Sequence, residues 1–130
     1  MSGRIPRAQR RVERLVAAGD RQFRVGDVEA ARRLYLEAAR LEEEIVSTLA
    51  PSPHLGTLAC GCVLLYRFGG DAVAARMAAE RCLQRGMDER AEGWLMDQVS
   101  ELTMGSHPVA AQAAFRSAMA ELISLRQRVA

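Results

Sequence analysis

Short sequences that interrupt helices divide this chain into six stretches, and this division is what most constrains its fold. Each stretch has 14 or more residues, and apolar side chains recur in it at helical spacing, as at Tyr35, Ala38 and Ile45. Long stretches with this period favour helices over strands. The expected helices span about residues 6–24, 27–49, 54–68, 71–85, 88–104 and 108–129. The sequence therefore predicts an all-α protein with six helices.

The residues at the boundaries indicate where these helices start and how they pair. Asp27, Asp71 and Asp88 can each accept a hydrogen bond from an unpaired amide of a first turn, and Pro108 suits a first helical position. The turns near residues 26, 70 and 106 are short, so neighbouring helices should pair antiparallel. A chain of 130 residues is the size of one domain. We expect a single domain over 1–130, built from three antiparallel hairpins at about 6–49, 54–86 and 88–129.

Similar sequences follow the three expected turns. They read "GDVEAARRLYLEAARL" at 26–41, "GDAVAARMAAERCL" at 70–83 and "HPVAAQAAFRSAMAEL" at 107–122. Each places a pair of alanines four or five residues after the turn. This similarity indicates that one helical hairpin is repeated along the chain.

The repeated unit resembles the tetratricopeptide repeat, a helix-turn-helix unit of about 34 residues. In the first copy, at 12–45, the small and aromatic positions of that family fall on Gly19, Gly26, Ala31, Tyr35 and Ala38. The second copy, at 56–89, and the third, at about 92–125, match fewer positions. They keep Tyr66, Gly70, Ala75, Ala111, Phe115 and Ala118, with Trp94 near the first-helix aromatic. The resemblance implies three hairpins stacked as a short right-handed solenoid.

The resemblance also implies a function, because such solenoids hold a peptide or helix of another protein in a concave groove. The groove would be lined by residues of the first helix of each hairpin. These are Val16, Asp20, Phe23, Arg24, Cys60, Leu64, Arg67, Met96, Ser100 and Thr103. We expect a non-enzymatic protein-protein interaction module, an adaptor or an escort chaperone.

The first predicted helix is rich in arginine and supports a second interpretation. All 18 basic residues are Arg, and residues 1–24 carry seven of them against two acids. Arg7, Arg10, Arg11, Arg14 and Arg21 fall on one side of this helix. Arginine binds phosphates well, so the chain is alternatively a nucleic-acid-binding or regulatory subunit.

Two further interpretations of the charges and of the fold stay open. The arginine face can instead be a solvated surface that pairs with acids such as Glu37, Glu42 and Glu44, and we favour this one because the net charge is only +2. No aromatic residue interleaves with the arginines for base stacking. A third candidate function is a homo-oligomeric assembly component whose task is to pack against copies of itself.

The sequence has no recognisable motif for catalysis, a metal or a cofactor. His54 and His107 have no Cys or acid at ligand spacing, and Cys60 and Cys62 would point about 200° apart on a helix. The charge run "LEEEIV" at 41–46 is typical of a solvated helix face. We therefore expect no enzyme activity.

The N-terminus and the cysteines indicate the cellular compartment of the protein. The N-terminus is charged rather than apolar, and three cysteines make an odd count. The least charged run, 55–66, is shorter than the roughly 20 residues that a bilayer requires. We expect a cytoplasmic protein without a membrane partner.

Overall fold

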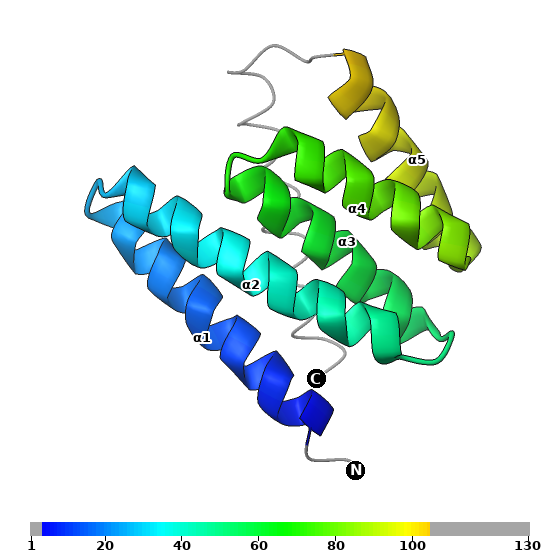
Figure 1. Ribbon diagram of the computed structural model, residues 1–130, viewed down its shortest axis with the longest axis horizontal. Coiled ribbons are helices and arrows are strands. Elements are labelled where there is room, and N and C mark those ends of the chain that lie inside the picture. The colour runs from blue at the N-terminus through cyan, green and yellow to red at the C-terminus, as the bar shows by residue number, and fades with distance from the viewer. Residues whose placement is uncertain (1–3, 105–130) are drawn as a thin grey trace.

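The structure, a computed structural model, describes residues 4–104 and consists there of helices joined by short turns (Figure 1). The helices are α1 (Arg4–Arg24), α2 (Val28–Thr48), α3 (Pro53–Phe68), α4 (Ala72–Arg85) and α5 (Glu89–Met104). Each begins and ends within two residues of its expected position. Because these residues contain no strand, the all-α prediction is confirmed.

The prediction of six helices in three hairpins is wrong. The described residues form five helices, which make the hairpins α1–α2 and α3–α4 followed by the single helix α5. The expected second member of the third hairpin, at about 108–129, lies outside the described residues. The first two turns each combine a Gly at positive φ, 88° at Gly26 and 79° at Gly70, with an Asp that starts the next helix. The sequence at 105–108 has no such Gly-Asp pair, so the third hairpin was expected only from Pro108, from the apolar period after it and from its similarity to the first two hairpins, none of which specifies a helix pair.

Side-chain caps explain why the helices begin where they do. Asp27 Oδ1 accepts from the Ala30 amide at 3.1 Å and Asp71 Oδ1 from the Ala74 amide at 2.9 Å. Asp88 Oδ1 accepts from the amide three residues later at 3.3 Å, so all three expected caps are confirmed. Ser52, which was not among the expected caps, caps α3 in the same way. Pro108 lies outside the described residues.

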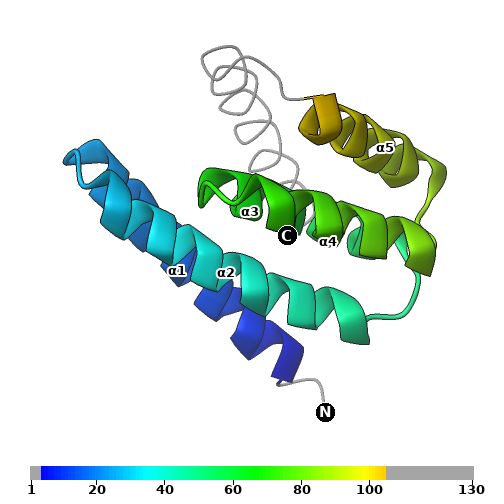
Figure 2. The ribbon, with the colours of Figure 1, turned by 45° about the horizontal axis from the view of Figure 1, so that its top comes forward.

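Helices that follow one another in the chain lie side by side, and α3 also contacts α5. Figure 1 and Figure 2 show α1 and α5 at opposite ends of the arrangement, with α3 between α2 and α4 or α5. One buried apolar cluster runs through it from Val12 of α1 to Leu95 of α5. The described helices therefore share a continuous core.

Small residues let α1, α2 and α3 approach one another closely around Tyr35. A Cβ added to Gly19 would lie 2.7 Å from Tyr35 Cε1, so only glycine leaves room for the ring. The Tyr35 hydroxyl donates to Asp20 Oδ1 at 2.6 Å. The rings of Tyr35 and Phe68 are also in a T-shaped contact, with ring centroids 4.8 Å apart. Tyr35 thus ties the first hairpin to the second.

The charge run in α2 is less solvated than the sequence suggested. Glu42 is only 2% exposed, because it lies four residues after the buried Ala38 and hence on the same side of α2. Glu43 accepts from the Tyr66 hydroxyl at 2.7 Å and from two nitrogens of Arg81 at 2.8 and 2.9 Å. Of the three acids, only Glu44 is fully on the surface. The run therefore links α2 to α3 and α4.

Candidate functional site

A second, smaller apolar cluster adjoins the main core, because Phe68 and Trp94 pack against both. It is centred on Leu64, which is 1% exposed, and includes the partly buried Cys60, Phe68 and Trp94. At 100° per residue, Leu64 points about 160° away from Cys62, a residue of the main core. Helix α3 is therefore apolar on two opposite sides.

Two members of this Leu64 cluster were not among the expected groove residues. Phe68 follows Leu64 by four residues, so helical spacing alone places it on the same side of α3. Trp94 belongs to α5, and its contact with Leu64 depends on how α5 packs against α3. The sequence identified Trp94 as an aromatic of the repeat, with no signal that it would reach this cluster.

Arg67 closes one end of the same side of α3 with polar contacts. Its Nη1 donates to Gln98 Oε1 and, at 3.3 Å, to Glu101 Oε2, both on α5. The Arg67 side chain is largely buried by these contacts. The guanidinium therefore joins α3 to α5 and is not a free charge at the surface.

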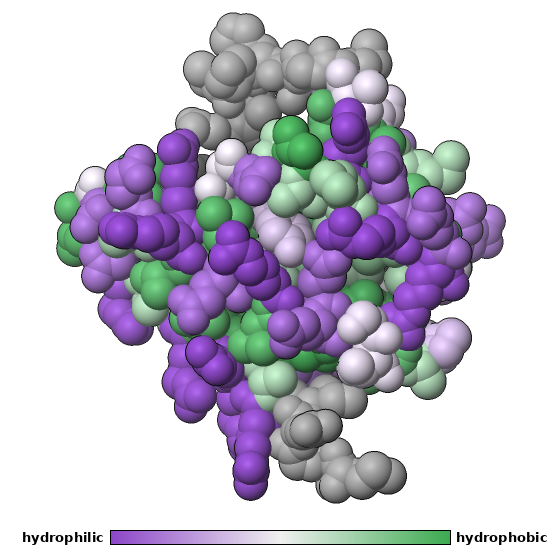
Figure 3. All heavy atoms as spheres, viewed as in Figure 1, coloured by the Kyte–Doolittle hydropathy of each residue, from purple (hydrophilic) through white to green (hydrophobic). Residues whose placement is uncertain are grey.

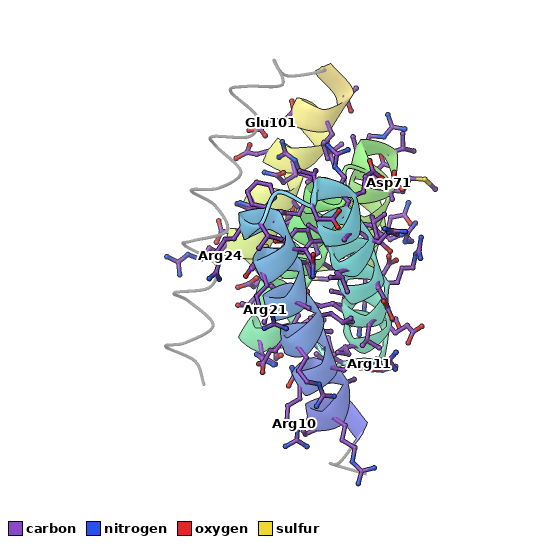
Figure 4. The ribbon with its side chains drawn as sticks, turned by 90° about the vertical axis from the view of Figure 1, so that its left-hand side faces the viewer. Arg10, Arg11, Arg21, Arg24, Asp71 and Glu101 are labelled. Atoms are coloured by element: carbon purple, nitrogen blue, oxygen red, sulfur yellow. The ribbon has the colours of Figure 1, made fainter. Side chains whose placement is uncertain are left out.

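The α1 residues expected in the groove divide between packing and exposure. Val16 is partly buried and packs against the main core. Asp20 accepts the Tyr35 hydroxyl. Phe23 is 38% exposed, and Arg24, one residue further, is exposed at the end of α1. Figure 4 shows Arg24 at the margin of the molecule.

The α5 residues expected in the groove are all exposed and lie apart from the Leu64 cluster. Met96 and Ser100 each point about 160° away from the buried Gln98, and Thr103 about 140° away. The Thr103 hydroxyl donates to the Val99 carbonyl at 2.7 Å within the same helix. The expected residues of each helix share one side of that helix, but the ten are not brought together: of them only Cys60 and Leu64 belong to the Leu64 cluster, with Arg67 beside it.

The cysteines are free thiols that resist ionisation. Burial, and then the neighbouring Cys82 thiol, raise the pKa of Cys60 to about 12. Burial, and then the charge of Glu43, raise the pKa of Cys82 to about 11. Burial also raises the pKa of Cys62. Since the thiolate is the reactive form, these thiols are weak nucleophiles at neutral pH.

The arginine side chains of α1 between residues 7 and 24 are exposed. Within residues 4–104 the one ion pair that they form joins Arg11 to Glu37, at 3.5 Å between exposed groups. Glu42, one of the acids expected to pair with them, is buried in α2 instead of lying at the surface. Figure 4 shows Arg10, Arg11 and Arg21 projecting outward from α1.

The described residues offer no cluster of metal ligands. No group of three or more His, Cys, Asp or Glu side chains suited to a metal ion occurs between residues 4 and 104. His54 is exposed, with Nε2 3.1 Å from Gln9 Nε2, and His107 lies outside the described residues. Among α1 to α5 there is no helix with the length and apolar character needed to cross a bilayer.

No protein-family model, no curated protein sequence and no solved structure matches this chain.

Proposed function

We propose that this protein is a non-enzymatic, cytoplasmic interaction module that binds a peptide or helix of another protein against the Leu64 cluster. The observation that carries the proposal is the second apolar side of α3. A helix packed on one side of a core is normally polar on the opposite side. Here the side opposite Cys62 carries Cys60, Leu64 and Phe68, with Trp94 beside them, and Phe68 and Trp94 also pack against the main core.

The composition of the cluster fits an interface. Leu64 is buried, while Phe68 and Trp94 around it keep part of their surface exposed. Large aromatic side chains provide much contact area for few rotatable bonds and are common at energetically important interface positions. Arg67, held by Gln98 and Glu101, supplies a polar rim at one end. An apolar residue of a partner would bury the remaining aromatic surface next to this rim.

Other observations support the same proposal. The resemblance to tetratricopeptide repeats points to protein binding rather than catalysis. The raised pKa values of the thiols disfavour cysteine nucleophiles. Three free cysteines fit a reducing compartment such as the cytoplasm.

The chain contains one tryptophan, Trp94, which makes it a reporter for the proposed interface. A photo-crosslinking amino acid at position 60 should capture the partner, and mass spectrometry of the crosslink identifies it. The purified partner should then shift the Trp94 emission, and Trp94→Ala should weaken its binding by about 10-fold or more. Crosslinking from position 44 on α2, which is exposed and lies outside the Leu64 cluster, is the control and should fail. Binding that Trp94→Ala leaves unchanged would exclude the Leu64 cluster as the interface.

Self-association is a second candidate function, supported by the exposed apolar residues of α4. Figure 3 shows hydrophobic side chains gathered over the first turns of α4, and Val73 and Met77 there are exposed one turn apart. A homo-oligomer would be detected as a molar mass above that of the monomer in light scattering. Met77→Glu should return it to the monomer, and a strict monomer at high concentration would eliminate this candidate.

A further inference from the structure

Four arginines form a straight stripe along the outer side of α1. At 100° per residue, Arg7, Arg10, Arg14 and Arg21 fall within a sector of about 60°. From the first to the last, the stripe is about 21 Å long at 1.5 Å per residue. All four side chains are exposed, and the buried Val12 lies on the opposite side of the helix. We call these four residues the arginine stripe.

The stripe carries charge of one sign only. The two acids of α1, Glu13 and Asp20, lie outside the 60° sector, and Asp20 is hydrogen-bonded to Tyr35. The outer side of α2 is different, since Arg33 and Arg40 each precede an exposed glutamate by four residues. Charges of both signs on α2 reduce one another's field, whereas the stripe's charges add.

The first and last described helices, α1 and α5, also differ in charge. Helix α1 has seven arginines against two acids, whereas α5 has the single Arg90 against four acids. The two helices lie at opposite ends of the arrangement (Figure 1). A polyanion is therefore attracted toward the α1 end and repelled from the α5 end. The small net charge of +2 conceals this polarity.

We infer that the arginine stripe binds the sugar-phosphate backbone of double-stranded nucleic acid without sequence preference. A duplex presents about one negative charge per 1.7 Å of its axis, so a rigid row of arginines about 21 Å long meets phosphates along its whole length. The guanidinium group donates to phosphate oxygens in a planar, bidentate manner. Along the chain between Arg14 and Arg21, the residues that flank the stripe are Ala17 and Ala18. Alanine offers no polar atom to read a base edge.

The same geometry disfavours the other polyanions. Single strands are held largely by stacking on aromatic residues, and Phe23, the one aromatic of α1, lies on the other side of the helix. An anionic membrane is held firmly only when apolar residues or lipids insert into it. Val12, Leu15 and Val16 pack against the core and are not available for insertion. The observations therefore favour the duplex.

The experiment is a titration of the full-length chain against labelled duplexes of about 20 base pairs and two unrelated sequences, followed by fluorescence anisotropy. Both duplexes should bind equally. Four phosphate contacts predict a salt slope of about −3.6, so that affinity falls roughly 150-fold between about 50 and 200 mM salt. The triple variant Arg7→Gln, Arg10→Gln, Arg14→Gln should reduce the slope to about −1.

A matched variant makes the result specific to the stripe. Arg33→Gln, Arg40→Gln, Arg90→Gln changes the net charge equally but alters exposed arginines of α2 and α5, and it should retain the wild-type slope. The far-UV circular dichroism of both triples checks that they fold. If both triple variants lose the same affinity for the duplex, the inference is overturned, because binding would then follow net charge alone. Tighter binding to a single strand of the same length, to polyglutamate or to vesicles containing phosphatidylserine would overturn it as well.

Discussion

Replacing Gly19 by alanine tests the close contact on which the first hairpin depends. Inside a helix, alanine is ordinarily about 1 kcal/mol more favourable than glycine. At this position the new Cβ would lie 2.7 Å from Tyr35 Cε1 and 3.0 Å from two further ring atoms. The Tyr35 ring cannot withdraw freely, because its hydroxyl donates to Asp20 and the ring is also in contact with Phe68.

The expected magnitude follows from the balance of these effects. Overpacking a close-packed core costs about 1–3 kcal/mol, which exceeds the gain in helix propensity. We expect Gly19→Ala to lower the free energy of unfolding by about 1 kcal/mol and the Tm by about 4 °C. Gly93 in α5 is the matched control, since no atom lies within 4 Å of its added Cβ. Gly93→Ala should raise the free energy of unfolding by about 0.5–1 kcal/mol.

Urea unfolding followed by circular dichroism measures both variants against the wild type. Combining Gly19→Ala with Tyr35→Leu adds a further check, since the shorter side chain removes the clash and the alanine should then no longer destabilise. If Gly19→Ala is as stable as the wild type, or if both alanine variants shift stability in the same direction, the Gly19–Tyr35 contact does not limit the approach of α1 and α2.

Three further predictions address the polar contacts and the thiols. Glu43→Gln should lower the free energy of unfolding by about 1–2 kcal/mol, because it weakens charge-assisted hydrogen bonds to a tyrosine hydroxyl and an arginine. The control Glu44→Gln, at an exposed position, should change the free energy of unfolding by less than about 0.5 kcal/mol in urea unfolding. Asp71→Ala removes the cap of α4 and should lower the free energy of unfolding by about 1 kcal/mol, and with it the Tm. An unchanged Tm would contradict the capping role. The pKa of Cys82 is raised to about 11 in the folded state, so the stability contributed by its neutral thiol is fully present below about pH 8.5 and is lost as the pH rises toward 11. When the pH is raised from 8 to 10.5, the free energy of unfolding of Cys82→Ala should therefore fall by about 2 kcal/mol less than that of the wild type. Equal decreases in the two proteins would show that the pKa of this thiol does not change on folding.

The helices and their limits were predictable from the sequence because their signals are local. Glycine at positive φ ends one helix and an aspartate caps the next within four residues, as at Gly26-Asp27 and Gly70-Asp71. The arginine side of α1 was predictable for the same reason, since helical spacing alone places those residues together. The same spacing places Phe68, four residues after Leu64, on one side of α3 with it.

What depended on tertiary structure were the contacts between helices, since no spacing along one helix specifies which neighbour a side chain meets. Packing of α5 against α3 places Trp94 beside Leu64 and leaves Met96 exposed, and it turns Arg67 into a link to Gln98. Packing also buries Glu42 within a run of charges that reads as solvated. The sequence by itself determined where the chain is helical, because hydrogen bonds within a helix join residues four apart. Only the packed structure decided which faces meet, because burial depends on side chains that are distant along the chain.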